Sequence, residues 1–425
     1  MDFDIKYVKA LQVLDSRGDP TVEVIVVTEG GGVGRAIAPA GASRGRLEAV
    51  DLRDGGKAYG GRGVRKAVEA VNKYIAPAIK GMDSSKYREV DRKIIEIDGT
   101  ANKSRLGGNA TTATSLAVVN AAADTAGVPL FEFLGGCRAR TLPTPLMNII
   151  NGGAHAGNEL SIQEFMIVPV GADSFSEAIK IAVEVYKTLK NTLKESYGAS
   201  AINVGDEGGF APPIKRTEEA LNVMVKSISE AGYEPGSDVM LALDAAASHF
   251  YSNGKYRIDG KILEPYELLD LYLDLVTRYP IVSIEDPFHE DQANMFKELR
   301  GGIKGKALVI GDDLTVTRVE RVKEFMEKGA IDGAIIKINQ VGTLSEAEDV
   351  IRYLLLNNGK AIVSHRSGES EDVSIAHIAV AYETGLIKAG APARGERTAK
   401  YNELLRIEDY LGGDATYLGI KSFLR

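Results

Sequence analysis

The spacing of hydrophobic and polar residues changes near residue 135, which predicts two domains of different construction. Before that point, β-branched residues at 21–27 predict a strand, and residues 33–37 are expected to pair back on it as a hairpin. Apolar residues recur at helical spacing over 63–80, and an alanine-rich helix is expected over 110–126. Strands followed by helices predict a small α+β domain over residues 1–135.

From residue 136 onward, short apolar runs alternate with amphipathic helices, which predicts an α/β barrel over residues 136–425. Apolar runs of this length are typical of buried parallel strands. Capping-box patterns predict that helices begin near Ser174, Thr317 and Ser345. The expected strands lie at 201–204, 239–243, 281–284, 307–310, 333–336, 360–363 and, more weakly, 385–387.

The composition of the 425-residue chain is that of a globular protein. Hydrophobic residues make up 44% and charged residues 26%, which argues against disorder, collagen and coiled coil. The net charge of −8 counts against a nucleic-acid partner. No apolar run is long enough to predict a membrane span, and the first residues lack the basic flank of a secretory signal. The single cysteine, Cys137, excludes an intrachain disulfide and favours a cytoplasmic location.

Ionisable residues follow the predicted strands at the point where each strand ends. In a (β/α)8 barrel these ends meet at one rim, where active sites lie. Taken singly, an aspartate after a strand is most often a helix cap or turn residue, and a lysine there is most often a snorkelling or salt-bridged lysine. Seven consecutive units that carry such residues favour a site instead. The residues are Glu207, Asp244, Glu285 with Asp286, Asp312 with Asp313, Lys337, His365 with Arg366 and Ser367, and Lys388.

This many carboxylates at one rim predict a bound cation, because buried charges must be paired or must coordinate a metal. Three carboxylates from successive strands suit a hard divalent cation with oxygen ligands. Mg²⁺ fits better than Zn²⁺, because Cys137 is not at the rim and no paired-histidine motif occurs.

Two lysines and one glutamate are the candidates for acid–base chemistry. Lys337 and Lys388 are expected to lie near each other and near the metal, and nearby positive charge lowers a lysine pKa and lets it act as a base. Glu207 is the best candidate for the acid. A metal, a base and an acid together suit proton abstraction next to a carboxylate. Arg366 and Ser367 are typical of a clamp for phosphate.

Longer motifs occur in order over essentially the whole chain. They are LDSRG at 14–18, PTVEV at 20–24, GAS at 41–43, NIINGG at 148–153, HAG at 155–157, QEFM at 163–166, GDEGGF at 205–210, SIEDP at 283–287, GDDLTVT at 311–317, KINQVGT at 337–343, SHRSG at 364–368 and KAGAPAR at 388–394. Taken together, these motifs resemble the enolase family. The resemblance implies a barrel that starts ββαα, which would explain why residues 141–200 lack clean alternation.

The resemblance implies reversible dehydration of 2-phospho-D-glycerate to phosphoenolpyruvate, in glycolysis and gluconeogenesis. Lys337 would remove the C2 proton, and Glu207 would protonate the departing C3 hydroxyl. Arg366 and Ser367 would hold the phosphate, and Lys388 the carboxylate. The implied substrate-binding residues are His155, Gln163, Glu164, Glu285, Asp312, Lys337, His365, Arg366, Ser367 and Lys388.

The resemblance also implies two Mg²⁺ ions per active site. Asp244, Glu285 and Asp312 would bind the first, and Ser43 would reach the second when its loop closes. A homodimer or octamer in the cytoplasm is expected, and a surface or secreted fraction and secondary surface partners stay open, with nothing in the sequence to indicate them. Arg44 departs from the family pattern, because it replaces a small residue beside Ser43.

Two alternatives are weaker. Another proton-abstracting enzyme of the same superfamily, such as a racemase or cycloisomerase, would share the barrel and the metal carboxylates but differ in its acid–base residues. A non-catalytic binding protein on the same scaffold could lose site residues freely. Neither alternative explains why Lys337, Glu207, His155 and Arg366 all stand in the family's positions.

Overall fold

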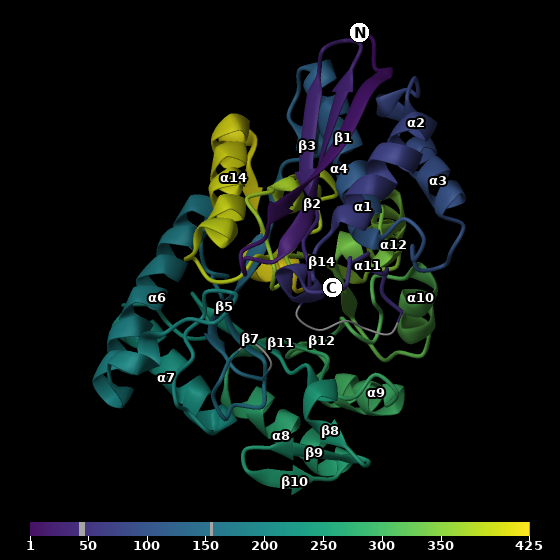
Figure 1. Ribbon diagram of the computed structural model, residues 1–425. Coiled ribbons are helices and arrows are strands. Elements are labelled where there is room, and N and C mark those ends of the chain that lie inside the picture. Colours follow the sequence, from purple (N-terminus) through teal and green to yellow (C-terminus); the bar gives the residue numbers. More distant parts are fainter. Residues whose placement is uncertain (42–46, 154–155, 425) are drawn as a thin grey trace.

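The computed structural model describes residues 1–41, 47–153 and 156–424 (Figure 1). Its first three strands form an antiparallel sheet with β2 in the centre, as the predicted hairpin requires. Gly34 on β3 allows α4 to approach closely, because a Cβ there would collide with the α4 backbone at Ala117 and Ala121. The strands are β1 (Ile5–Leu14), β2 (Pro20–Thr28) and β3 (Val33–Ile37), and α4 is Gly108–Ala126.

The helices of this first unit agree with the predicted periodicity. The segment expected over 63–80 is helical with one π turn in its middle, and most of α4 is buried. Among the described residues, no single helix is long and apolar enough to cross a membrane, although the bent pair Gly108–Ala126 and Leu130–Arg138 together has the length and composition of a span. The other elements are η1 (Ala58–Gly61), α1 (Arg65–Ala70), η2 (Val71–Ile75), α2 (Ala76–Ile79), η3 (Ser84–Lys86), α3 (Tyr87–Asp98), α5 (Leu130–Gly135) and η4 (Gly136–Arg138).

Eight strands then close into a barrel in the order β5-β6-β7-β11-β12-β13-β14-β15. All neighbours are parallel except that β6 runs antiparallel to both β5 and β7. Apolar side chains from these strands form a separate buried cluster, as expected for the packed interior of a barrel. They include Met166, Ala242, Ile335 and Ile362. The strands are β5 (Thr144–Asn151), β6 (Glu164–Val168), β7 (Met240–Asp244), β11 (Ile281–Glu285), β12 (Leu308–Gly311), β13 (Gly333–Ile336), β14 (Lys360–Ser364) and β15 (Leu386–Lys388).

Helices surround the barrel, and the first two follow one another, so that the barrel begins ββαα (Figure 1). The expected α/β barrel with a smaller α+β unit is therefore confirmed. The helices are α6 (Phe175–Tyr197), α7 (Thr217–Glu230), α8 (Pro265–Arg278), α9 (Ala293–Gly302), α10 (Val319–Glu327), α11 (Ile338–Val341), α12 (Leu344–Leu356), α13 (Ser374–Ala381) and α14 (Gly395–Leu411). Short elements complete the chain: β4 (Thr141–Leu142), η6 (Ala199–Ile202), η7 (Ala247–Phe250), β8 (Tyr251–Ser252), β9 (Lys255–Ile258), β10 (Lys261–Leu263), η8 (Gly412–Asp414), β16 (Thr416–Tyr417) and η9 (Gly419–Ser422).

The strand predicted at 201–204 is wrong. Ala199–Ile202 is a 3₁₀ turn, and Val204 makes only an isolated bridge to Phe210. The barrel positions before β7 are already filled by β5 and β6, so this apolar run packs as a loop. Glu207 therefore reaches the rim from a loop and not from the end of a strand.

Two of the three predicted helix starts are displaced. The Ser174 hydroxyl accepts the Glu177 N–H at 3.1 Å, as predicted. Thr317 does not cap a helix, because its hydroxyl accepts the Lys337 N–H at 2.9 Å and α10 begins only at Val319. Thr343, two residues before the expected Ser345, caps α12.

The first unit covers the rim formed by the carboxyl ends of the barrel strands. Ala40 and Gly368 exchange two backbone hydrogen bonds of 2.8 Å. Lys103 forms an ion pair of 2.8 Å with Glu346, and Glu48 reaches Arg366. These contacts place residues of both units around one cavity.

Candidate active site

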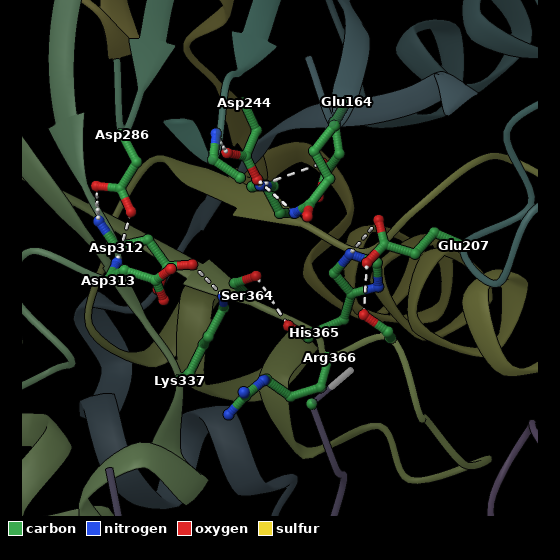
Figure 2. A pocket seen from close by; sticks show the side chains of 15 residues that line it. Glu164, Glu207, Asp244, Asp286, Asp312, Asp313, Lys337, Ser364, His365 and Arg366 are labelled. Carbon is green, nitrogen blue, oxygen red and sulfur yellow. Dashed lines mark hydrogen bonds and ion pairs between the residues drawn. The ribbon is translucent and has the colours of Figure 1, made fainter. Parts of the chain in front are cut away.

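A narrow polar cavity of about 30 Å³ lies at the rim of the barrel (Figure 2). It collects most of the residues that the sequence singled out, from strands and loops far apart in the chain. Ser43, Arg44 and His155 lie outside the described residues. The lining consists of Gly41, Gln163, Glu164, Glu207, Asp244, Ala246, Asp286, Asp312, Asp313, Lys337, Ser364, His365, Arg366, Ser367 and Lys388.

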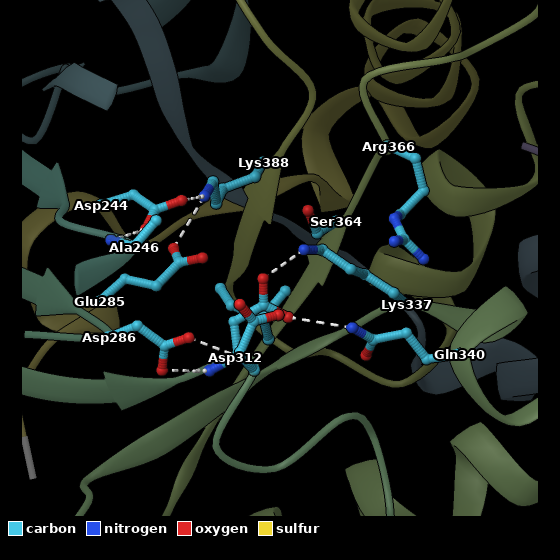
Figure 3. Close-up of polar contacts among 12 residues, drawn as sticks. Asp244, Ala246, Glu285, Asp286, Asp312, Lys337, Gln340, Ser364, Arg366 and Lys388 are labelled. Carbon is cyan, nitrogen blue, oxygen red and sulfur yellow. Dashed lines mark hydrogen bonds and ion pairs between the residues drawn. The ribbon is translucent and has the colours of Figure 1, made fainter. Parts of the chain in front are cut away.

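Strand register brings three carboxylates side by side. Glu164 on β6 pairs with Asp244 on β7, and Asp244 pairs with Glu285 on β11. Lys388 at the end of β15 reaches all three. Its Nζ lies 3.2 Å from Glu164. It also lies 2.7 Å from Glu285 and 3.5 Å from Asp244 (Figure 3). Burial, followed by the charge of neighbouring carboxylates, raises the pKa of Glu164 and of Glu285.

The second lysine is paired with a different carboxylate. Lys337 forms an ion pair with Asp312, and the Gln340 side-chain amide donates to the other Asp312 oxygen at 3.2 Å (Figure 3). Burial alone would lower the pKa of Lys337, but the Asp312 carboxylate outweighs it and raises this pKa above its ordinary value. The expected low lysine pKa is therefore not found here, because the expectation counted nearby cations and not this carboxylate.

Asp286, Asp312 and Asp313 form a compact acidic group. One carboxylate oxygen from each lies within 4.8 Å of the others. Asp286 accepts the backbone N–H of Asp312 at 2.9 Å and that of Asp313 at 2.6 Å (Figure 2). Burial and the nearby Asp312 charge raise the pKa of Asp313 to about 7. Both oxygens of Asp286 are thus occupied in holding the loop after β12.

The donor set fits a hard divalent cation. Glu285 Oε1 is buried with no hydrogen-bond partner among the described residues, which leaves it available as a ligand. Oxygen donors dominate, as Mg²⁺ prefers. The described residues at the rim include three cationic side chains, Lys337, Arg366 and Lys388, against seven carboxylates: Glu164, Glu207, Asp244, Glu285, Asp286, Asp312 and Asp313.

Glu207 lies across the cavity from Lys337 (Figure 2). The Asn148 amide donates to Glu207 at 3.1 Å and the Ser367 hydroxyl at 3.3 Å. His365 Nε2 lies 3.6 Å from the same carboxylate. Burial lowers the pKa of His365 well below its ordinary value, so this imidazole is neutral.

Two further expected residues line the cavity with polar groups. Arg366 is nine-tenths buried or more, and its guanidinium donates to Asn339 at 2.9 Å and to Glu48 at 3.1 Å. Gln163 donates to Asp244 at 3.4 Å, and its own carbonyl oxygen is buried with no hydrogen-bond partner among the described residues.

Some residues of the site were missed as site residues in the sequence. Asn148 and Gln340 stand inside family motifs, so a signal was present, but neither was given a role. Glu48 and Arg397 lie in no motif quoted above. Their approach to Arg366 and His365 depends on packing between distant segments, which no local pattern encodes.

A closed β/α barrel with acidic and basic side chains gathered at its rim is typical of the β/α-barrel enzymes, whose active sites lie at the carboxyl ends of the strands. Residues 5–134 match the family described as "Enolase, N-terminal domain", and residues 139–425 match "Enolase, C-terminal TIM barrel domain". The chain therefore belongs to the enolase family, as the resemblance of its motifs implied.

Relatives named enolase are similar over nearly their full length. The enolase of Aeropyrum pernix is 55% identical over 98% of this chain and 97% of its own. That of Methanocaldococcus jannaschii is 55% identical over 96% of each chain. That of Thermococcus gammatolerans is 54% identical over 98% of this chain and 97% of its own.

The raised pKa of Asp313 predicts a pH-dependent stability. Because the folded pKa of about 7 lies above the ordinary 3.8, the folded state keeps a proton that the unfolded chain loses in between. The contribution of Asp313 to stability therefore falls as pH rises through that window. Relative to the wild type, the free energy of unfolding of Asp313→Asn should increase by about 1 kcal/mol or more as the pH rises from about 5 to about 8. Denaturant unfolding in chelator measures this gain, and a pH-independent difference would contradict it.

Proposed function

We propose that this enolase-family chain catalyses the Mg²⁺-dependent, reversible dehydration of 2-phospho-D-glycerate to phosphoenolpyruvate, in glycolysis and gluconeogenesis. The observation that carries the proposal is the placement of Lys337 and Glu207 on opposite sides of one cavity, with Arg366 and Ser367 on the same lining (Figure 2). A substrate held by its phosphate would then offer C2 to one residue and the C3 hydroxyl to the other.

Lys337 is the proposed base. Its backbone N–H donates to the Thr317 hydroxyl at the end of β13, and its side-chain amine forms the ion pair with Asp312. To accept the C2 proton the amine must be neutral, so the charge of Asp312 must be engaged elsewhere during the reaction. A cation on Asp312 would meet that requirement.

Glu207 is the proposed acid. Asn148 and Ser367 orient its carboxyl group with one hydrogen bond each. In the forward direction it gives a proton to the C3 hydroxyl, which leaves as water, and the C2–C3 double bond forms. Elimination is thereby divided between Lys337 at the end of β13 and Glu207 on a loop across the cavity.

The remaining lining supplies the anion sites. We propose that Arg366 and Ser367 bind the phosphate and that Lys388 binds the carboxylate, because these groups suit charge-assisted hydrogen bonds to oxyanions. Gln163, Glu164, His365 and, outside the described residues, His155 complete the pocket. Glu48 competes for Arg366 in the free chain, so phosphate must displace or share this ion pair.

Two Mg²⁺ ions are proposed per active site. Asp244, Glu285 and Asp312 would hold the first, and Ser43, outside the described residues, would reach the second. Bound there, the cations stabilise the negative charge that builds on the substrate carboxylate when C2 loses its proton. Asp286 is left out of this ligand set because both its oxygens already accept backbone amides.

We also propose a division of the chain into residues 1–135 and 136–425, a homodimer or octamer, and a cytoplasmic location. The division is supported by β4, which pairs with the C-terminal β16 and so belongs with the barrel. The location is supported by the single cysteine, Cys137, which is exposed and forms no intrachain disulfide. The assembly rests on the family alone.

Separating the two half-reactions tests the assignment of base and acid. Lys337→Ala should lose exchange of the C2 proton with solvent by more than about 100-fold, because the base is gone. Glu207→Gln should keep exchange while dehydration falls by a similar factor. NMR in D₂O follows exchange, and ultraviolet absorbance follows phosphoenolpyruvate. Equal loss of both signals in Glu207→Gln would rule out its role as the acid. No product from the wild type with Mg²⁺ would reject the function.

Two sets of carboxylates are distinguished by their effect on the Mg²⁺ requirement. Asp244→Asn and Glu285→Gln should raise the Mg²⁺ concentration for half-maximal activity by about tenfold or more, because each removes a proposed ligand charge. Asp286→Asn serves as the matched control and should change it less than either of these substitutions, because Asp286 acts only through the loop after β12. The reverse pattern would assign the metal to Asp286, Asp312 and Asp313 instead.

A further inference from the structure

We infer that Arg397 is a positioning residue for this reaction, which sets the tautomer of His365 and ties the loop of Glu207 to the loop of Arg366 and Ser367. The inference rests on the proposed function and adds a residue to it. No motif quoted above contains Arg397, and it does not line the cavity.

Arg397 lies in the first turn of α14 and is fully buried. One guanidinium nitrogen, Nη1, donates to His365 Nδ1 and to the Arg366 carbonyl, each at 2.6 Å. The other, Nη2, donates to the Ser367 carbonyl at 2.6 Å and to the Asp206 carbonyl at 2.9 Å. Three of these four hydrogen bonds go to backbone carbonyls of the two segments that carry the proposed acid and the phosphate clamp, and the fourth goes to the His365 side chain.

The contact with His365 fixes where the imidazole proton sits. A guanidinium has N–H donors and no acceptor, so the His365 nitrogen that faces it must accept. Nδ1 therefore carries the lone pair, and in the neutral ring the proton must be on Nε2. That nitrogen is the one 3.6 Å from the Glu207 carboxylate. Arg397 acts on the acid through His365.

This tautomer suits an acid at Glu207. With a proton on Nε2, His365 presents a donor toward Glu207 and has no lone pair on that side to take the proton that Glu207 must deliver to substrate. After Glu207 has given up its proton, the same N–H faces the carboxylate that remains. The opposite tautomer would place a lone pair there and offer a competing acceptor.

Gly390, after β15, packs closely against Arg397, Glu207 and His365. Gly390 has φ +84, and a Cβ on it would lie 2.8 Å from Arg397 Cδ, 2.8 Å from the Glu207 carbonyl and 3.1 Å from His365 Cε1. The Ala391 N–H also bonds the Glu207 carbonyl at 2.9 Å. The segment after β15 therefore packs closely against the Arg397 stem, the Glu207 backbone and the His365 ring.

Lys400, one turn further along α14, offers a matched control. It is also fully buried, and its amine binds Glu369 at 2.7 Å and the Ser370 carbonyl at 2.6 Å. Its third hydrogen bond goes to the Glu396 carbonyl on its own helix at 2.8 Å, so the two outside α14 reach Glu369 and Ser370, which follow the active-site residues in the chain. Among the contacts described for Lys400, none is a hydrogen bond to His365.

The test is the tautomer of His365, read by two-bond ¹H–¹⁵N NMR on the full chain with labelled histidine, without substrate. His365→Gln identifies its signals among the five histidines. The wild type should show one neutral form with the proton on Nε2. A proton on Nδ1 in the wild type overturns the inference without recourse to any variant. This reading also stands apart from the proposed function, whose failure would be absence of turnover in a wild type with the expected tautomer.

Variants then connect the tautomer to rate. Arg397→Met should lose the single Nε2–H form, and its kcat should fall by about tenfold or more, because general-acid catalysis by Glu207 would lose the fixed donor that faces it. Lys400→Met should keep the tautomer and lose markedly less kcat. Arg397→Met with an unchanged tautomer, or with a kcat equal to that of Lys400→Met, overturns the inference. If Arg397→Met does not fold, Arg397→Lys is read against the same two criteria.

Discussion

Carboxylates crowded into one largely buried rim are the constraint on which the rest of this site depends. Strand register alone aligns Glu164, Asp244 and Glu285, so their repulsion is built into the barrel. Desolvation and mutual repulsion both work against their ionised forms, which is why the pKa values of Glu164 and Glu285 are raised. Such a rim is stable only with positive charge inside it.

The chain supplies part of that charge and arranges it in two layers. Lys388 and Lys337 enter the cavity from neighbouring parts of the barrel, each against its own carboxylates. Behind them, Arg397 and Lys400 are buried against backbone carbonyls of the loop after β14. The inner layer faces substrate and the proposed cations. The outer layer holds the loops in place, and in our proposal Arg397 also decides which nitrogen of His365 bears the proton.

Much of this arrangement could be predicted from local sequence, because short apolar runs are typical of buried barrel strands. The strands ending at Asp244, Glu285 and Lys388 are where the pattern placed them. The strand predicted at 201–204 was wrong. A short apolar run can also pack as a 3₁₀ turn, and β5 and β6 already form the barrel before β7. The helix start predicted at Thr317 was also wrong. Its hydroxyl accepts the Lys337 N–H and donates to the Gln340 side chain, so it does not cap a helix. Glu48 and Arg397 act across distant segments, so no local pattern marks them.

If this rim is built for divalent cations, calorimetric titration of the chelator-treated protein with Mg²⁺ should detect their binding. Titrations near pH 6.5 in two buffers of different ionisation enthalpy report both binding and the protons that accompany it. Carboxylates with raised pKa values hold protons in the free protein, so Mg²⁺ binding should release protons into the buffer. No binding at millimolar Mg²⁺, or binding with no proton release, would contradict the account.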